Sequence, residues 1–247
     1  MQSSFSELEY EAKKKQTRRD RFLAEIEAAT PWSSLTNVIA PHYPASGRPG
    51  RPPVGLERIL RMYVAQQCFG LSDEGTEDAV YDSQAIRRFV GIDLNREAVP
   101  DATTLLKFRH LLEEHQLTES IFNAINAHLA DRGLFLREGT IVDATLIAAP
   151  PSTKNKERKR DTEMHQTKKS NQWHFGMKVH IGVDAQSGLV HTLIGTAANV
   201  HDVTQAQALL HGDETDVFGD AGYQGVEKRG ENLELPVTCH IVMRPSK

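Results

Sequence analysis

The sequence has little cysteine and no long apolar run. Only two cysteines occur among its 247 residues, Cys68 and Cys239, and they lie far apart. This spacing excludes a zinc site built on thiolates and indicates a reducing compartment. No apolar stretch approaches the roughly 20 residues of a membrane span, and the charged N-terminus is unlike a signal peptide. We therefore predict a cytoplasmic protein that has no membrane partner.

The sequence also lacks an excess of positive charge. Its formal net charge is −4 at pH 7, so any binding to nucleic acid has to come from local basic patches. Hydrophobic residues make up 39% and charged residues 25%, which is typical of an ordinary globular protein. A chain of this length suits one large domain or two small ones.

Two acidic residues stand out because of their surroundings. Asp143 lies inside the apolar, β-branched run 139–147, where a lone carboxylate is costly unless it is paired or bound to a metal. Asp220 follows a predicted strand at 216–218 and has glycines close by on both sides. An Asp-Gly turn is the plainer interpretation of Asp220 alone. Together, the two acids predict a carboxylate pair that holds divalent metal ions.

The N-terminal segment combines a helical pattern with a basic run. Residues 1–30 have apolar side chains at helical spacing, and the basic run at 13–21 is either a solvated face or a phosphate contact. The Pro- and Gly-rich stretch 41–55 is predicted to be extended. Its Arg48 and Arg51 are either part of a plain linker or contacts to a DNA minor groove.

Residues 54–132 have the pattern of several short helices. Ser72 and Asp101 are predicted to cap two of them at their N-termini. Lys107 and Arg109 lie off the apolar stripe of the helix that Asp101 precedes, so that helix has a basic face. This arrangement suits a DNA-docking module of the helix-turn-helix type, and it suits a bundle used only for packing equally well.

Residues 150–172 are rich in Pro, Lys, Asn, Ser and Thr. We predict a basic loop here that is mobile without a partner. Its candidate contacts to DNA phosphates are Lys154, Lys156, Arg158, Lys159, Arg160, Lys168 and Lys169.

The clearest strand lies at 174–184, where polar and apolar residues alternate strictly. A five-residue loop at 184–188 then predicts a hairpin with a second strand at 189–197. Lys178 and His180 share one face of the first strand. That face either is solvated, as in an ordinary strand, or lines a site, where Lys178 would contact DNA.

The remaining pattern sets the topology. A helix for which Asp202 is a plausible cap follows the hairpin, then the strand before Asp220, a short polar segment and a last strand at 239–243. The order β, β, β, α, β, α, β puts antiparallel strands first and a crossover second. In a ribonuclease-H-like sheet this connectivity makes the first and fourth strands neighbours. We therefore expect Asp143 and Asp220 to lie side by side.

Several blocks of residues resemble one group of transposases. These blocks are 141–145 (Ile-Val-Asp-Ala-Thr), 161–184, 196–202, 219–223 (Gly-Asp-Ala-Gly-Tyr), 55–61, 71–74 and 100–109. They are similar to the transposases of the insertion-sequence-five group. The resemblance covers most of the chain from about residue 40 on. It implies an N-terminal helical segment (1–43), a helical DNA-binding domain (44–135) and a ribonuclease-H-like core with a mixed sheet (136–247).

The same resemblance implies an Asp-Asp-Glu transposase that cleaves and transfers DNA strands with Mg²⁺, or Mn²⁺, as cofactor. Asp143 and Asp220 match the first two catalytic acids, which are metal ligands. The implied partners are double-stranded DNA, as terminal inverted repeats and as target, and further copies of the chain on that DNA. The implied location is the cytoplasm of a bacterium, on its nucleoid.

The sequence departs from the group at the third acid. That glutamate belongs to a pattern of Tyr, two residues, Arg, three residues, Glu, six residues and Lys. Glu227, Glu231 and Glu234 do not fit this spacing, so no third acid is assigned. The chain is therefore interpreted as incomplete before that glutamate, as part of a split or frameshifted enzyme or as a remnant. The alternatives are a metal nuclease without strand transfer and a non-catalytic DNA-binding remnant or regulator of the intact transposase.

Overall fold

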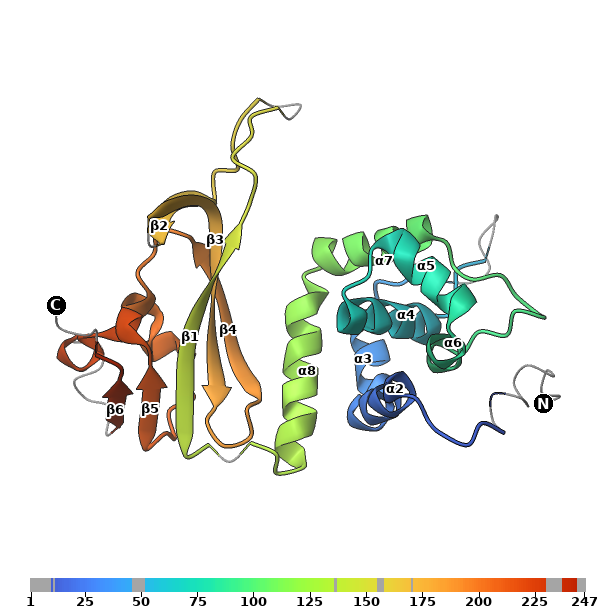
Figure 1. Cartoon of the computed structure of the whole chain (residues 1–247), viewed down its shortest axis with the longest axis horizontal. Helices are drawn as coiled ribbons and strands as arrows, with labels where there is room; N and C mark the ends of the chain where they lie inside the picture. The colour runs from blue at the N-terminus through green and yellow to red at the C-terminus, as the bar shows by residue number, and fades with distance from the viewer. Residues whose placement is uncertain are drawn as a thin grey trace. The chain divides into compact units, whose positions relative to one another are not determined.

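The structure is a computed structural model, and it describes residues 10, 12–45, 52–135, 137–154, 158–169, 171–229 and 237–243. The chain divides into two compact units, Met1–His128 and Leu129–Lys247. The first unit is helical, and the second is built on one open mixed sheet (Figure 1). This α+β architecture is compatible with a ribonuclease-H-like core in the second unit.

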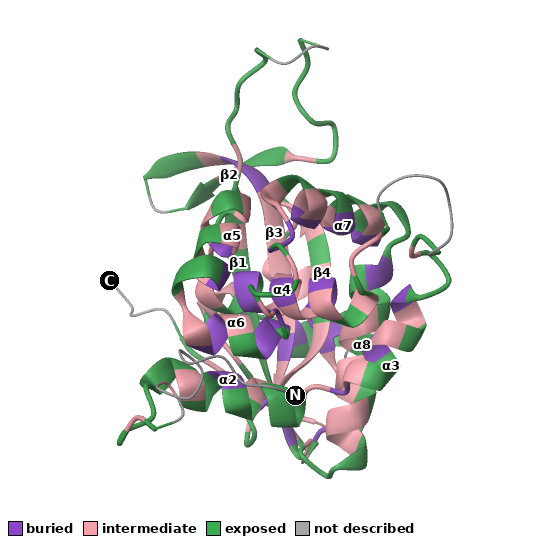
Figure 2. Cartoon of the chain, turned by 90° about the vertical axis from the view of Figure 1, so that its right-hand side faces the viewer, coloured by how far each residue is buried: buried purple, intermediate pink, exposed green. Residues whose placement is uncertain are grey.

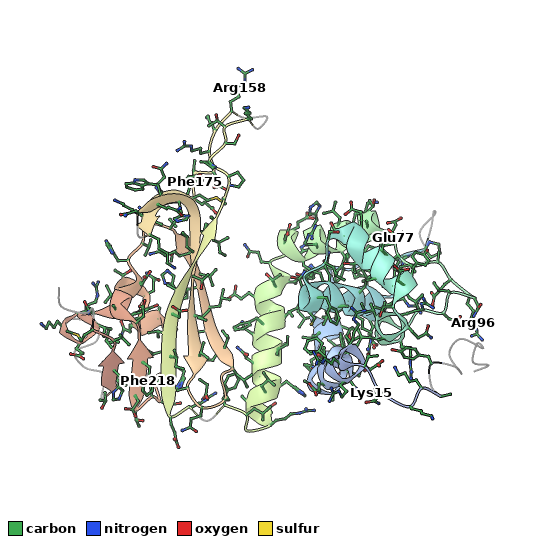
Figure 3. All side chains as sticks on the ribbon, viewed as in Figure 1. Lys15, Glu77, Arg96, Arg158, Phe175 and Phe218 are labelled. Carbon is green, nitrogen blue, oxygen red and sulfur yellow. The ribbon has the colours of Figure 1, made fainter. Side chains whose placement is uncertain are left out.

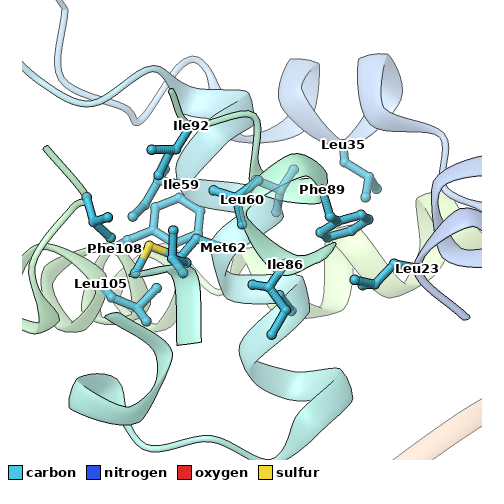
Figure 4. Close-up of a cluster of buried hydrophobic side chains, with 14 of the residues drawn as sticks. Leu23, Leu35, Ile59, Leu60, Met62, Ile86, Phe89, Ile92, Leu105 and Phe108 are labelled. Atoms are coloured by element: carbon cyan, nitrogen blue, oxygen red, sulfur yellow. The ribbon is translucent and has the colours of Figure 1, made fainter. Parts of the chain in front are cut away.

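The helices of the first unit share one apolar core. They are α2 (Arg18–Ala29), α3 (Trp32–Ile39), α4 (Leu56–Phe69), α5 (Asp73–Asp82), α6 (Gln84–Val90), α7 (Ala102–Glu114) and α8 (Leu117–Asp131), which continues across the boundary between the units. Ile59, Leu60 and Met62 of α4 are at most 1% exposed and lie at the centre of this core (Figure 4). The predicted short helices over residues 54–132 are present, and their apolar faces are buried in this core.

The predicted helix caps are present. Ser72 accepts a hydrogen bond from the backbone N–H of Gly75 at 2.9 Å, and Asp101 accepts one from that of Thr104 at 2.7 Å. Each bond satisfies a backbone donor that the first turn of a helix leaves unpaired. Because a cap depends only on residues three positions apart, sequence alone was enough to find it.

The prediction of helix throughout residues 1–30 is wrong, because the described part of this segment is not continuously helical. Residues 1–9 and 11 lie outside the described part of the chain, and α2 begins only at Arg18. Thr17 and Asp20 form a reciprocal capping box there, which ends the helix on its N-terminal side. The basic run 13–21 is consequently split between an irregular segment and the first turn of α2.

The strands of the second unit are β1 (Gly139–Ala148), β2 (His165–Lys169), β3 (Gln172–Asp184), β4 (Val190–Ala197), β5 (Asp216–Gly219) and β6 (Thr238–Ile241). The sheet order is β2-β3-β1-β5-β6, and β4 also pairs with β3. Strand β3 is antiparallel to β1, β2 and β4, whereas β1, β5 and β6 are parallel. The predicted change from antiparallel strands to a parallel crossover is confirmed.

The predicted basic loop 150–172 is too long, because β2 lies within it. Residues 165–169 pair with residues 172–176 of β3, so part of the loop is the outer strand of a hairpin. The cationic side chains of β2 hid this strand, since sheet edges commonly carry lysine. The segment between β1 and β2 projects from the sheet, and its residues 150–154 and 158–163 are exposed (Figures 1 and 2).

The predicted helix beginning at 199–202 is also wrong. Two 3₁₀ turns stand there instead, η1 (Asp202–Gln205) and η2 (Gln207–Leu209), and Asp202 is the first residue of η1 and makes no cap. Leu209 is nevertheless fully buried, so the segment crosses the sheet as expected. Two further turns follow β5, η3 (Ala221–Tyr223) and η4 (Val226–Lys228).

The segment that connects β4 to β5, called the crossover from here on, covers the polar face of β3. His180, Gly182 and Asp184 are buried, whereas Ile181 and Val183 are only partly buried. The interpretation of the His180 face as solvated is therefore wrong. Gly182 lies against the backbone of η2, because a Cβ at this position would stand 2.3 Å from the carbonyl oxygen of Leu209.

This contact predicts a large effect of a single methyl group. We expect Gly182→Ala to destabilise the second unit by about 1–3 kcal/mol or more, since the opposing atom is backbone and cannot rotate away. Gly195→Ala is the matched control, because a Cβ at Gly195 has nothing within 4 Å. Urea unfolding followed by circular dichroism measures both variants. Equal stability of the two would contradict the packing described here.

Candidate active site

Asp143 and Asp220 come from neighbouring parallel strands. The last paired positions of β1 and β5 are Val142 and Gly219, and each acid is the next residue along its strand. Both acids are exposed. The two residues are therefore neighbours at the end of the shared β1–β5 ladder, as the topology predicted.

The backbone holds each carboxylate in place without neutralising it. One oxygen of Asp143 accepts a hydrogen bond from the N–H of Ala144 at 2.8 Å, and one of Asp220 accepts from the N–H of Gly222 at 2.8 Å. In the described part of the chain no lysine, arginine or histidine forms an ion pair with either acid. Each carboxylate thus retains lone pairs for an additional ligand.

A third carboxylate, Asp202, lies beside Asp220. A Cβ built at Gly222 would stand 2.9 Å from Oδ1 of Asp220 and 3.0 Å from Oδ2 of Asp202, so both oxygens border the same small space. Lys178 Nζ donates to Oδ1 of Asp202 and to the carbonyl of Val200, each at 2.8 Å. Asp202 was expected to cap a helix, and its position beside Asp220 was not predicted, since only the fold brings the two residues together.

The pKa of Tyr223 is affected by the charges of these three carboxylates. Its side chain is fully buried, and its hydroxyl has no hydrogen-bond partner among the described residues. Burial raises the pKa of Tyr223, and the negative charges of Asp202, Asp143 and Asp220 raise it further. The three carboxylates therefore all lie close enough to Tyr223 to affect its hydroxyl. Oxygen donors of this kind are the ligands that Mg²⁺ and Mn²⁺ prefer.

The candidate DNA-contacting residues fall into several groups. Lys154, Arg158, Lys159 and Arg160 belong to the projecting segment, with Arg158 near its tip in Figure 3, and Lys168 and Lys169 are exposed on β2. Lys107 is exposed on α7. Arg48, Arg51 and Lys156 lie outside the described residues.

Several candidate cations make contacts within the protein. Arg109 forms an ion pair with Asp73 at 2.9 Å, and Arg160 donates to the carbonyl of Pro151 at 3.1 Å. Lys178 is mostly buried and forms an ion pair with Asp202, so it does not lie on a solvated strand face, and its role as a DNA contact stays a prediction.

Comparison with protein families agrees with this geometry. A model described as Transposase domain (DUF772) matches residues 10–111, and a model described as Transposase DDE domain matches residues 134–244. No solved structure matches the chain. The chain belongs to the DDE-type transposases of insertion sequences. Its narrower resemblance to the insertion-sequence-five group stays a prediction.

None of the helices in the described part of the chain combines the length and the hydropathy of a transmembrane span.

Gly222 offers a test of the carboxylate group that leaves the rest of the fold intact. We expect Gly222→Ala to displace the Asp220 and Asp202 carboxylates and to weaken Mn²⁺ binding about tenfold or more, because the new methyl group occupies the space between them. The atoms that must move are side-chain oxygens, so the melting temperature should change little. Calorimetric titration with Mn²⁺ measures the effect, and Gly195→Ala is again the control. Unchanged Mn²⁺ affinity would show that Gly222 does not border the place where the metal ion binds.

Proposed function

We propose that this transposase binds the DNA at the ends of its element and catalyses metal-dependent cleavage and transfer of DNA strands. Asp143 and Asp220 hold the divalent ion in this proposal. The observation that supports it most directly is the parallel register of β1 and β5, which places the two acids one residue beyond the pair Val142 and Gly219.

The residues present fit Mg²⁺ or Mn²⁺. The donors of Asp143 and Asp220 are carboxylate oxygens at an exposed strand end, and they form no ion pair with a described cation. A site for a hard ion that also contacts a phosphate requires both properties. Divalent ions bound there would activate water or a DNA 3′-hydroxyl and neutralise charge on the leaving oxygen. The chain itself then has to position the DNA and keep the carboxylates in place.

Asp202 is the third acid in this proposal. Lys178 fixes its orientation and offsets part of its charge, so three acids can lie near one another before a metal ion arrives. An ion bound between Asp202 and Asp220 would compete with Lys178 for the same carboxylate. This role is separate from that of the glutamate in the family pattern, which remains unassigned.

DNA would reach the carboxylates along two exposed basic surfaces. The projecting segment and β2 supply Lys154, Arg158, Lys159, Lys168 and Lys169 as phosphate contacts. The helical unit, with Lys107 on α7, is the proposed docking module for the element ends, and copies of the chain would assemble on that DNA.

Strand cleavage tests the catalytic assignment. We expect Mg²⁺- or Mn²⁺-dependent nicking of element-end DNA, reduced about 10²–10³-fold in Asp143→Ala, because one preorganised charge at the reacting phosphate is lost. Asp202→Asn should also lower nicking, and Glu163→Ala, an exposed acid on the projecting segment, is the control.

The alternatives predict other outcomes of the same assay. Nicking without any joined product indicates a metal nuclease. The pairing of Asp202 with Lys178 favours a second candidate, a DNA-binding remnant or regulator, since a neutralised acid is a poor metal ligand. Binding with no nicking above that of Asp143→Ala would support this second candidate and contradict catalysis by the chain.

Salt dependence tests the projecting segment as a DNA contact. Neutralising its five basic residues, Lys154, Lys156, Arg158, Lys159 and Arg160, should lower the slope of log K against log salt by up to about 4–5 units on duplex DNA. Lys228→Gln, on η4, is the control and should change the slope by about 1 unit at most. A slope unaffected by all five changes would make this segment a solvated insertion.

A further inference from the structure

A second group of side chains of the types that can ligate a metal lies at the other end of the same two strands. His191 belongs to β4, whereas His211 and Glu214 belong to the turn that precedes β5. Thr140, near the start of β1, contacts both His191 and Glu214, at 3.1 and 3.0 Å. The carboxylates described above instead follow the last paired residues of the β1–β5 ladder, so the two groups are separate.

A β-bulge directs His191 into this group. Gly182 pairs with Thr192 and Val183 with Val190, which leaves His191 as the extra residue of β4. Such an extra residue turns its side chain out of the normal alternation of the strand. The ring lies over Gly182, where a Cβ would stand 2.8 Å from its Cε1. The bulge and the glycine together make room for this imidazole on the covered face of the sheet.

Glu214 brings a buried carboxylate to the group. It is 4% exposed and accepts hydrogen bonds from the hydroxyl of Thr140 and from the backbone N–H groups of His211 and Gly212, the latter two at 2.6 and 2.7 Å. Burial by itself raises the pKa of Glu214, but these backbone bonds lower it overall, so the group is ionised. Among the described residues its only ion-pair partner is the His211 ring. These hydrogen bonds compensate for the burial of the carboxylate, and a bound cation would add to that compensation.

His211 has an unused ring nitrogen that points to that carboxylate. Its Nε2 is buried, has no hydrogen-bond partner among the described residues and lies 3.4 Å from Oε1 of Glu214. Burial and the neighbouring His211 lower the pKa of His191, which keeps the His191 ring neutral and able to act as a ligand.

We propose that His191, His211 and Glu214 bind one transition-metal ion of the Zn²⁺ class. One donor atom from each residue lies within 4.8 Å of the other two, which allows a common ion after small side-chain adjustments. Two imidazoles and a carboxylate favour Zn²⁺ or Co²⁺, whereas the all-oxygen group at Asp143 and Asp220 favours Mg²⁺ or Mn²⁺. A fourth position is left for water.

Metal binding requires a change at both histidines. The hydroxyl of Thr140 donates to Glu214, so Nε2–H of His191 now donates to that hydroxyl at 3.1 Å. An ion on Nε2 replaces this hydrogen bond and moves the ring proton to Nδ1.

With the ion on Nε2 of His191, its Nδ1–H donates to the hydroxyl of Thr192, 2.8 Å away, an outer contact that metal-bound histidines commonly make. The ion on Nε2 of His211 puts the ring proton on Nδ1. The hydrogen bond that Nδ1 now accepts from the N–H of Asp213 at 3.2 Å must then break.

The proposed ion has a structural consequence. It links the bulge of β4 to the turn at 211–214, which connects the crossover to β5. It would therefore fasten the covering segment to the sheet without taking part in chemistry on DNA.

Cobalt titration of the purified full-length chain tests this site. After removal of metals with a chelator, Co²⁺ should give an intense visible absorption that Zn²⁺ abolishes by displacement, because a nitrogen-containing site of low coordination absorbs far more strongly than an all-oxygen site. We expect His191→Ala and His211→Ala each to weaken Co²⁺ binding more than tenfold. His165→Ala, an exposed histidine of β2, and Asp143→Ala should keep the full signal.

Thr192→Val provides a variant that leaves all three ligands in place. Removing the hydroxyl beside Nδ1 of His191 should weaken Co²⁺ binding by about 10–100-fold, whether or not the histidine variants fold. Zn²⁺ should also raise the melting temperature of the wild type and not that of Thr192→Val at the same concentration. An absent cobalt band, or one lost equally in His165→Ala or Asp143→Ala, would overturn the proposal and leave a hydrogen-bonded network.

Discussion

The parallel pairing of β1 with β5 is the constraint on which the second unit depends. Parallel neighbours cannot be joined by a tight turn, so the chain from β4 to β5 has to cross one face of the sheet. The register of this pair aligns Val142 with Gly219 and so brings Asp143 next to Asp220. The crossover also delivers Asp202 to Asp220, and its last turn delivers His211 and Glu214 to β1. One strand pairing therefore determines both groups of candidate ligands.

The crossover also decides which face of the sheet is buried. It covers the side that carries His180 and Gly182, while Ile141, Ile147 and Leu193 on the opposite side remain 39%, 52% and 54% exposed. Alternation along β3 predicted the strand, because it shows that two unlike faces exist. It could not predict which face another segment covers. A polar face is buried at low cost where its groups are hydrogen-bonded, as Asp184 is by the backbone N–H groups of Arg137 and Ser187 at 2.8 and 2.7 Å.

Sequence predicted the features that depend on near neighbours or on an anomalous residue. The caps Ser72 and Asp101 act over three residues, and Asp143 was conspicuous as an acid within a β-branched run. Strand β2 was not predicted, because its charged composition is unfavourable for a strand and only its pairing with residues 172–176 compensates for this. The third carboxylate, Asp202, was not predicted either, because its contact with Lys178 joins segments that only the folded sheet brings together. Local rules carry no information about such contacts.

Two glycines serve a similar purpose at the two candidate sites. Gly222 leaves space between the oxygens of Asp220 and Asp202, and Gly182 leaves space for the ring of His191 and the carbonyl of Leu209. At both positions a methyl group would occupy volume needed by a ligand side chain, so the missing Cβ lets donor atoms converge beside the backbone. The donors that converge differ in chemistry, oxygens alone in one group and imidazoles with one carboxylate in the other. The two groups of candidate ligands therefore favour different ions, Mg²⁺ or Mn²⁺ for the carboxylate oxygens and Zn²⁺ or Co²⁺ for the group that contains imidazoles.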